Sequence, residues 1–203
     1  MDQSRITSQV EQADIEVTME ATRHRDHPLV RTIGALSEIT DQPPAFTGAA
    51  LAALAGLLLN RPKLAEAGLR SFAALGIATL VKGTIKSSVT RTRPFMLRDK
   101  GHYDTRVGGP DDGPWNSFPS GHTANAVAIA RAVSRAYPDT APGGVAFAAV
   151  VGGIQIPRGS HYPLDVAAGA VVGLLSEKVV AILWQRAPAA QPGCASQPRA
   201  AAE

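Results

Sequence analysis

Five apolar segments, rich in alanine and glycine, constrain the fold of this chain more than any other feature. They are separated by stretches with proline, asparagine or charged residues, and they cover residues 45–59, 64–81, 123–137, 145–156 and 166–184. Glu66 and Arg70 in the second segment have the i,i+4 spacing of a helical ion pair. The sequence predicts an all-α fold, a helical bundle of about five apolar helices.

Before this bundle, residues 1–27 are polar and charged and have few apolar positions. Such a composition buries little apolar surface, so we expect a mobile or weakly helical arm. The arm lacks the apolar stretch of a secretory signal, and we expect none to be cleaved. Residues 187–203 are of low complexity, which predicts a disordered tail. The helical domain is therefore expected over residues 28–186.

A short N-terminal amphipathic helix is predicted between the arm and the first apolar segment. Four apolar residues recur there at helical spacing: Leu29, Ile33, Leu36 and Ile39. This pattern is typical of a helix that lies on a core or on a membrane surface. Residues 41–44 should end it, because two consecutive prolines do not continue a helix.

Each apolar segment is of marginal length for crossing a membrane. A spanning helix needs roughly 20 predominantly apolar residues, and every segment is shorter or contains charged residues. Glycine and alanine suit close helix contacts in lipid, although a soluble bundle would show the same small residues. The mean hydropathy of +0.01 fits both alternatives. We favour a multi-pass protein embedded in the cell membrane.

Charge and spacing argue against several classes of protein. The formal net charge of +3 is spread along the chain, which disfavours nucleic acid as a partner. The single cysteine, Cys194, cannot form an internal disulfide. His102 is a weak candidate for a zinc ligand, and no paired carboxylates accompany the histidines at metal-ligand spacing. We expect no metal site.

The stretch from Phe118 to Thr123 most strongly suggests a binding site. Ser120 is a favourable N-cap residue, and Gly121 lets the main chain approach a ligand closely. The unpaired N–H groups at the helix start would face an anion, with the titratable imidazole of His122 beside it. The alternative is an ordinary capped helix with a surface histidine.

Two further clusters lie at the ends of apolar segments. Lys86 and Arg93, before Pro94, either form a solvated basic helix end or converge on one phosphate. His161 and Asp165 are four residues apart, so the carboxylate can accept a hydrogen bond from the imidazole Nδ1–H and leave Nε2 free to attack. A purely structural pair is the alternative, but three such clusters at helix ends are not expected together by chance.

The motifs Lys-x6-Arg-Pro, Pro-Ser-Gly-His and His-x3-Asp, in this order, resemble the type 2 phosphatidic acid phosphatase superfamily, which also contains bacterial acid phosphatases and vanadium haloperoxidases. The resemblance covers residues 82–169. It implies a phosphatase domain over 28–186 that needs no metal or cofactor and forms a phosphohistidine. It also implies that His161 is the nucleophile, that Asp165 holds its ring, and that His122 protonates the leaving oxygen and then activates water.

One position departs from this resemblance. The third motif of the family usually has an arginine six residues before the nucleophilic histidine, where this sequence has Gln155. Arg158 follows one helical turn later, and we hypothesise that its longer reach supplies the missing charge. The resemblance then implies five phosphate-binding residues: Lys86, Arg93, Ser120, Gly121 and Arg158.

In a membrane bundle the three motifs would emerge on one face, where a phosphate at the headgroup layer meets them. We therefore expect a phospholipid or prenyl phosphate as substrate, either phosphatidate-like or a polyprenyl diphosphate. The polar N-terminus places this face in the cytoplasm, whereas the family resemblance favours the opposite side. Residues 95–115 are long for a connector, as lids and binding loops often are.

Two other functions fit the same motifs. A non-catalytic protein that binds phosphate headgroups would explain the change at Gln155. A vanadium haloperoxidase would hold vanadate in the same pocket. The intact nucleophile, acid and orienting carboxylate favour the phosphatase over both, and the sequence does not specify an oligomeric state.

Overall fold

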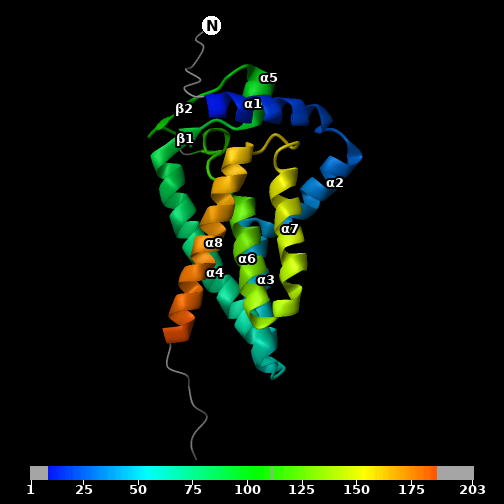
Figure 1. Ribbon diagram of the computed structural model, residues 1–203, viewed down its shortest axis with the longest axis vertical. Helices are drawn as coiled ribbons and strands as arrows, with labels where there is room; N and C mark the ends of the chain where they lie inside the picture. Colours follow the sequence, from blue (N-terminus) through cyan, green and yellow to red (C-terminus); the bar gives the residue numbers. More distant parts are fainter. Residues whose placement is uncertain (1–8, 111, 187–203) are drawn as a thin grey trace, which may run out of the picture.

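In the computed structural model, a bundle of long helices carries a cap of short elements across one end (Figure 1). The structure describes residues 9–110 and 112–186; the tail expected over 187–203, with Cys194, lies outside them. The bundle consists of α3 (Gln42–Leu58), α4 (Pro62–Ser88), α6 (Gly121–Ala136), α7 (Ala141–Ile154) and α8 (Pro163–Arg186). The all-α prediction with about five apolar helices is confirmed.

The amphipathic helix is also present, but the prolines after it act differently from the prediction. It forms α2 (Pro28–Ser37), continued by a 3-10 turn, η2 (Glu38–Thr40). The next helix, α3, already begins at Gln42, so the two prolines stand in its first turn. A proline is tolerated there because the N–H that it lacks would have no partner within the helix.

The bundle buries small residues and turns large ones outward. In α3 the buried positions are Ala45, Ala49, Ala53 and Gly56. A Cβ atom added at Gly68 of α4 would lie 2.2 Å from the backbone nitrogen of Ala53, and one added at Gly173 of α8 would lie 2.4 Å from the Ala124 carbonyl oxygen. Helix backbones therefore touch at these glycines, as they commonly do in membrane bundles.

Large apolar side chains cover the outside of the same helices. Those at least half exposed on α3, α4, α7 and α8 are Leu51, Leu54, Leu57, Leu58, Leu80, Val145, Val150, Val171, Leu175 and Leu183. Soluble proteins rarely show an apolar surface of this extent. Two helices, Pro62–Ser88 and Pro163–Arg186, are long and apolar enough to cross a membrane. The exterior of the bundle is therefore suited to lipid.

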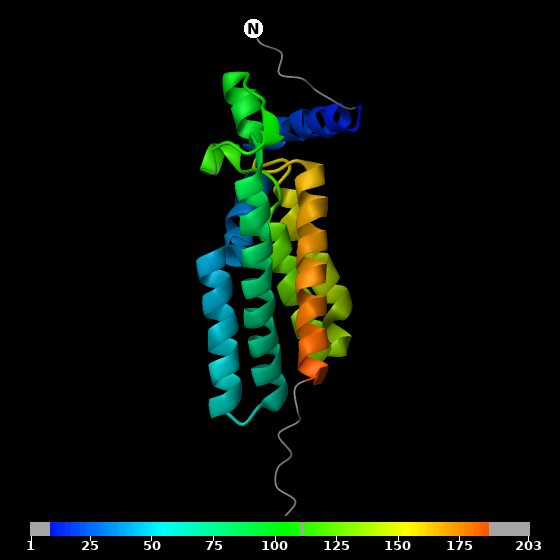
Figure 2. The same ribbon diagram turned by 90° about the vertical axis from the view of Figure 1, so that its left-hand side faces the viewer.

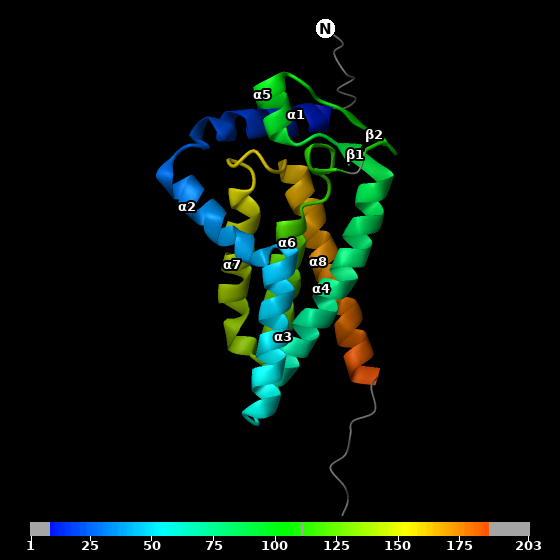
Figure 3. The same cartoon turned by 180° about the vertical axis from the view of Figure 1, so that it is seen from behind.

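The cap is built from the N-terminal helix and the long connection between α4 and α6. It contains α1 (Gln9–Ala21), η1 (Thr22–His24), β1 (Val89–Arg91), α5 (Pro94–Lys100), β2 (Thr105–Val107) and η3 (Gly113–Trp115); η4 (Pro138–Thr140) joins α6 to α7. The two strands pair antiparallel, with Thr90 opposite Arg106. Figure 2 shows α1 lying across the bundle axis, and Figure 3 shows α2 descending from the cap to α3.

Two predictions about this end are therefore wrong in part. The sequence predicts a mobile or weakly helical arm, but residues 9–24 form well-defined helical turns, and Asp14, Ile15 and Thr18 are buried. A polar helix becomes ordered here because its carboxylate finds a buried cationic partner that the local sequence does not reveal. The connection over 95–115 contains a helix and a strand instead of a continuous loop.

Candidate active site

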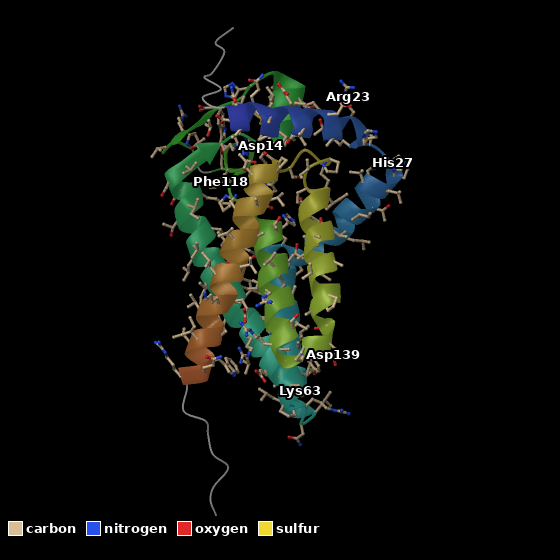
Figure 4. All side chains as sticks on the ribbon, viewed as in Figure 1. Asp14, Arg23, His27, Lys63, Phe118 and Asp139 are labelled. Atoms are coloured by element: carbon tan, nitrogen blue, oxygen red, sulfur yellow. The ribbon has the colours of Figure 1, made fainter. Side chains whose placement is uncertain are left out.

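The three sequence clusters meet beneath the cap. The backbone N–H of Ser120 donates to the carbonyl of Asp165 at 2.9 Å, and that of Phe95 donates to the carbonyl of Gly159 at 3.1 Å. In Figure 4, Phe118 lies at the same end of the molecule as Asp14, while Lys63 and Asp139 mark the opposite end. Segments far apart in the chain thus form one site at the cap end of the bundle.

His161 is buried, and its tautomer follows from one contact. Its Nδ1 lies 2.7 Å from the carbonyl oxygen of Ser117. A carbonyl oxygen only accepts hydrogen bonds, so Nδ1 carries the proton and Nε2 keeps its lone pair. Burial lowers the pKa of His161 to about 4; the charges of Arg93 and Lys86 act in the same direction, and the Asp165 carboxylate opposes them. The ring is therefore neutral and nucleophilic at neutral pH.

Asp165 does not accept the proton that the spacing predicted. Its Oδ2 lies 3.7 Å from His161 Nδ1, beyond hydrogen-bond range. The carboxylate instead accepts from the Ser117 hydroxyl at 2.5 Å, the Tyr162 N–H at 2.9 Å and Arg91 Nη1 at 2.7 Å. The expected direct pair is corrected to an indirect one, since Ser117 binds the carboxylate through its side chain and the imidazole through its backbone.

The charges of Lys86, in the last turn of α4, and Arg93, just before α5, both act on His161. Both side chains donate to Asn116. The Lys86 ammonium donates to the backbone carbonyl of Asn116, and Arg93 Nη2 donates to its side-chain oxygen at 3.4 Å. The Nε of Arg93 is a buried donor without a partner among the described residues. A buried guanidinium donor of this kind is costly unless something accepts from it. An anion in front of His161 would supply the acceptor.

Ser120 and Gly121 start α6 as predicted. The Ser120 hydroxyl accepts from the N–H and the hydroxyl of Thr123, at 3.4 and 2.9 Å. The peptide bond before Pro119 is cis. Lys82, one turn before Lys86, places its ammonium 3.4 Å from the position that a Cβ of Gly121 would occupy. Lys82 is therefore an additional buried cation at the helix start, which the sequence motifs did not single out.

His122, at the start of α6, faces a different partner. Its Nε2 lies 3.3 Å from Oε2 of Glu38, and the other carboxylate oxygen accepts from Arg158 Nη2 at 2.6 Å. Arg158 also donates to the carbonyl of Gly34 at 3.0 Å and to the Ser37 hydroxyl at 3.1 Å. In this structure Arg158 is thus bound to α2 and η2.

Comparison with known proteins agrees with this geometry. The model of the PAP2 superfamily matches residues 67–188, more than half of the chain. The chain belongs to the PAP2 superfamily. Lipid A 1-phosphatases of Rhizobium etli and Rhizobium johnstonii are 29% and 30% identical over 116 and 109 residues, which cover 57% and 53% of this chain and 49% and 43% of theirs. The chain thus spans about half the length of these curated relatives or less.

Two solved structures share the PAP2 fold with this chain. Aquifex aeolicus LpxE superposes with a TM-score of 0.64 at 21% identity, covering 83% of this chain and 94% of that one. The transmembrane PAP2 type phosphatidylglycerolphosphate phosphatase of Bacillus subtilis gives 0.67 at 20% identity, covering 92% and 91%. At such identities the likeness shows the fold.

Sequence reasoning missed the residue that ties the PAP2 site to the cap. Arg91 donates to Asp165 and, through Nη2 at 2.7 Å, to Asp14 of α1. Asp14 in turn accepts from the N–H of Leu164 at 2.9 Å, at the start of α8. The guanidinium also lies 4.0 Å from the centre of the Tyr162 ring. These partners are 74 and 77 residues from Arg91, so no local pattern could have revealed them.

Proposed function

We propose that this protein is a metal-independent phosphatase that hydrolyses a lipid phosphate or diphosphate through a phosphohistidine. The observation that carries the proposal is the state of His161, a buried neutral imidazole with its Nε2 lone pair free and two cations close by. Such a group attacks phosphorus readily once the anion is bound. The PAP2 family and the lipid phosphatases among its relatives point to the same chemistry.

In the first step His161 Nε2 forms a bond to phosphorus while the bond to the leaving oxygen breaks. His122 gives a proton to that oxygen, which leaves as an alcohol or a phosphate monoester. Asp165 acts through Ser117, because it fixes the loop whose carbonyl holds the imidazole proton. The ring therefore keeps its orientation while it becomes positively charged.

In the second step water hydrolyses the phosphohistidine. His122, now neutral, takes a proton from the attacking water; the P–N bond breaks and the electron pair returns to His161 Nε2. Inorganic phosphate then leaves, and both histidines regain their initial states. The two steps use one residue first as acid and then as base, as microscopic reversibility allows.

The phosphate oxygens would be bound by cations and by the start of α6. Lys86 and Arg93 provide positive charge beside His161, and the N–H groups after Ser120 point out of the helix end. We place Gly121 among these backbone donors. Arg158 adds positive charge next to His122, and a direct phosphate contact would require it to turn from Glu38. These charges offset the negative charge that spreads in the transition state, so the mechanism has no need of a metal.

The substrate class follows from the surroundings of the site. The apolar exterior supports a bundle embedded in lipid, and the cap end would then lie at the headgroup layer. We propose a multi-pass protein of the cell membrane whose substrate keeps its hydrocarbon chains in the bilayer. Loss of the protein from membranes on carbonate washing would contradict this location.

The test is hydrolysis of an aryl phosphate and of a lipid phosphate by the purified full chain in chelator. Wild type should release phosphate, and His161→Ala should lose at least about a thousandfold in kcat because the covalent path is removed. Acid quenching of wild type with labelled substrate should trap an acid-labile phosphoprotein. Binding without turnover would instead favour the headgroup-binding protein, and halide oxidation after vanadate addition would favour the haloperoxidase.

A further inference from the structure

Glu38 is a carboxylate at the site that belongs to none of the three motifs. It lies in η2, between α2 and α3, and its side chain is 48% exposed. One carboxylate oxygen is 3.3 Å from His122 Nε2 and the other is 2.6 Å from Arg158 Nη2. Glu38 thus links His122, which we assign as the acid, to Arg158, which lies three residues after Gln155.

Arg158 is itself held firmly against the end of α2. Its Nη1 donates to the carbonyl of Gly34 and to the hydroxyl of Ser37. A Cβ at Gly34 would lie only 2.7 Å from Arg158 Cδ, so the arginine stem lies directly over this glycine. The buried amide of Gln155 also donates to the Ser37 hydroxyl, at 3.1 Å. The guanidinium is therefore oriented before any ligand binds, and it fixes the Glu38 carboxylate.

We infer that Glu38 is the positioning residue of the acid: it accepts the Nε2 proton of His122 and so presents Nδ1 to the leaving oxygen, with Arg158 acting through Glu38. The inference rests on the proposed phosphatase function. The proton passes from Nδ1 to the leaving oxygen, and the neutral ring keeps its Nε2–H on Glu38. Arg158 is then needed for the geometry of the acid rather than for direct contact with phosphate.

The charges around His122 support this role. Burial holds the pKa of His122 below its ordinary value, and Arg158 also lowers it, while the carboxylates of Glu38 and Asp41 act against this net lowering. The ammonium of Lys82 also lies near, beside Gly121. Burial alone would raise the pKa of Glu38, but the hydrogen bond from Arg158 and the charge of His122 lower it below its ordinary value. Glu38 therefore stays ionised and favours protonated His122.

The experiment measures kcat/KM as a function of pH for wild type and for Glu38→Gln. The two substrates are p-nitrophenyl phosphate and an alkyl phosphate. The acid works only when protonated, so kcat/KM falls as pH rises through its pKa. Removing the Glu38 carboxylate lowers the pKa of His122. For the alkyl substrate, the descending limb of the pH profile should therefore move about one unit to lower pH, which means roughly tenfold less activity at neutral pH. The aryl substrate, whose leaving group needs little protonation, should change by less than about twofold.

Three controls keep this test decisive. Glu20→Gln removes an exposed carboxylate of α1 and should leave both profiles unchanged. Glu38→Asp keeps the negative charge, so the descending limb of its pH profile should lie close to that of wild type. A merely structural role of Glu38 would not require this. Gel filtration in detergent checks that each variant remains folded.

A double-mutant cycle assigns the role of Arg158. If it acts through Glu38, Arg158→Ala combined with Glu38→Gln should cost little more than either change alone. Additive losses, or equal losses for both substrates in Glu38→Gln, would overturn the inference. Failure of the proposed function is distinguishable, because then wild type hydrolyses neither substrate or His161→Ala remains active.

Discussion

The bundle and the cap end of this molecule are stabilised by opposite means. In the bundle, most buried positions are small, and backbones touch at Gly68 and Gly173. At the cap end, buried positions are charged: Arg91 lies between Asp14 and Asp165, each 2.7 Å away. Close packing of small residues is prominent in the bundle, and directional bonds between buried ions are prominent at the cap end.

This difference reflects the different requirements of the site and of the lipid-facing bundle. Apolar burial gives little preference for one packing over another when the exterior is lipid, so close backbone contact must specify the bundle. A catalytic imidazole needs its neighbours fixed to fractions of an ångström, which hydrogen-bonded ions can provide. Substitutions in the two regions should therefore have different signatures.

The largest effect is expected from Arg91→Met, which breaks the ion network of the cap. Two buried carboxylates would lose their common partner, and the stability loss should be about 3 to 5 kcal/mol. Activity should fall as well, because Asp165 fixes the loop that holds His161. Denaturant unfolding in detergent and kcat measure the two effects.

Arg70→Met in the bundle is the matched control. Arg70 pairs with Glu66 at 2.8 Å, but the Glu66 side chain is 34% exposed and keeps access to solvent. We expect a clearly smaller loss of stability and unchanged kcat. Equal losses in the two variants would contradict the proposed difference between cap and bundle.

A smaller effect is expected from Gly68→Ala, which tests backbone contact in the bundle. The new Cβ would lie 2.2 Å from the nitrogen of Ala53, so α3 and α4 must move apart. Overpacking of this kind costs about 1 to 3 kcal/mol. Gly68 lies near the end of α4 opposite to Lys86, so we expect little displacement at the site, and KM for an aryl phosphate should remain within about twofold while the melting temperature falls.

Gly76→Ala lies on the same helix and provides the comparison, since nothing lies within 4 Å of its added Cβ. Alanine favours a helix over glycine, so this variant should be neutral or more stable by about 0.5 to 1 kcal/mol. A loss as large as that of Gly68→Ala would show that glycine flexibility, rather than close contact, matters in α4.

The smallest stability effect is expected from Ser117→Ala. Its hydroxyl is one of three donors to Asp165, and the other two, from Arg91 and Tyr162, remain. We expect a loss of about 1 kcal/mol in stability but a clear fall in kcat, because the carboxylate no longer positions the loop around His161. Ser134→Ala, whose hydroxyl donates to the Ala130 carbonyl within α6, should change neither quantity. An unchanged kcat in Ser117→Ala would refute the indirect action of Asp165.

The sequence alone determined much of this protein. Helical periodicity and small-residue content determined the all-α bundle, because both are local properties of the chain. The place of each motif next to an apolar segment predicted that His122, His161 and Lys86 lie near helix ends. The order of the motifs indicated the PAP2 superfamily. The i,i+4 pair of Glu66 and Arg70 is present as predicted.

Only the tertiary structure decided how these parts are connected. The spacing of His161 and Asp165 suggested a direct hydrogen bond, yet residue 117, far away in sequence, supplies the acceptor. The order of α1 depends on Asp14 reaching Arg91, 77 residues away. Glu38 reaches His122 only because the bundle folds η2 against the start of α6. Helices arise from local backbone bonds, whereas a buried charge takes its partner from whichever segment the fold brings near.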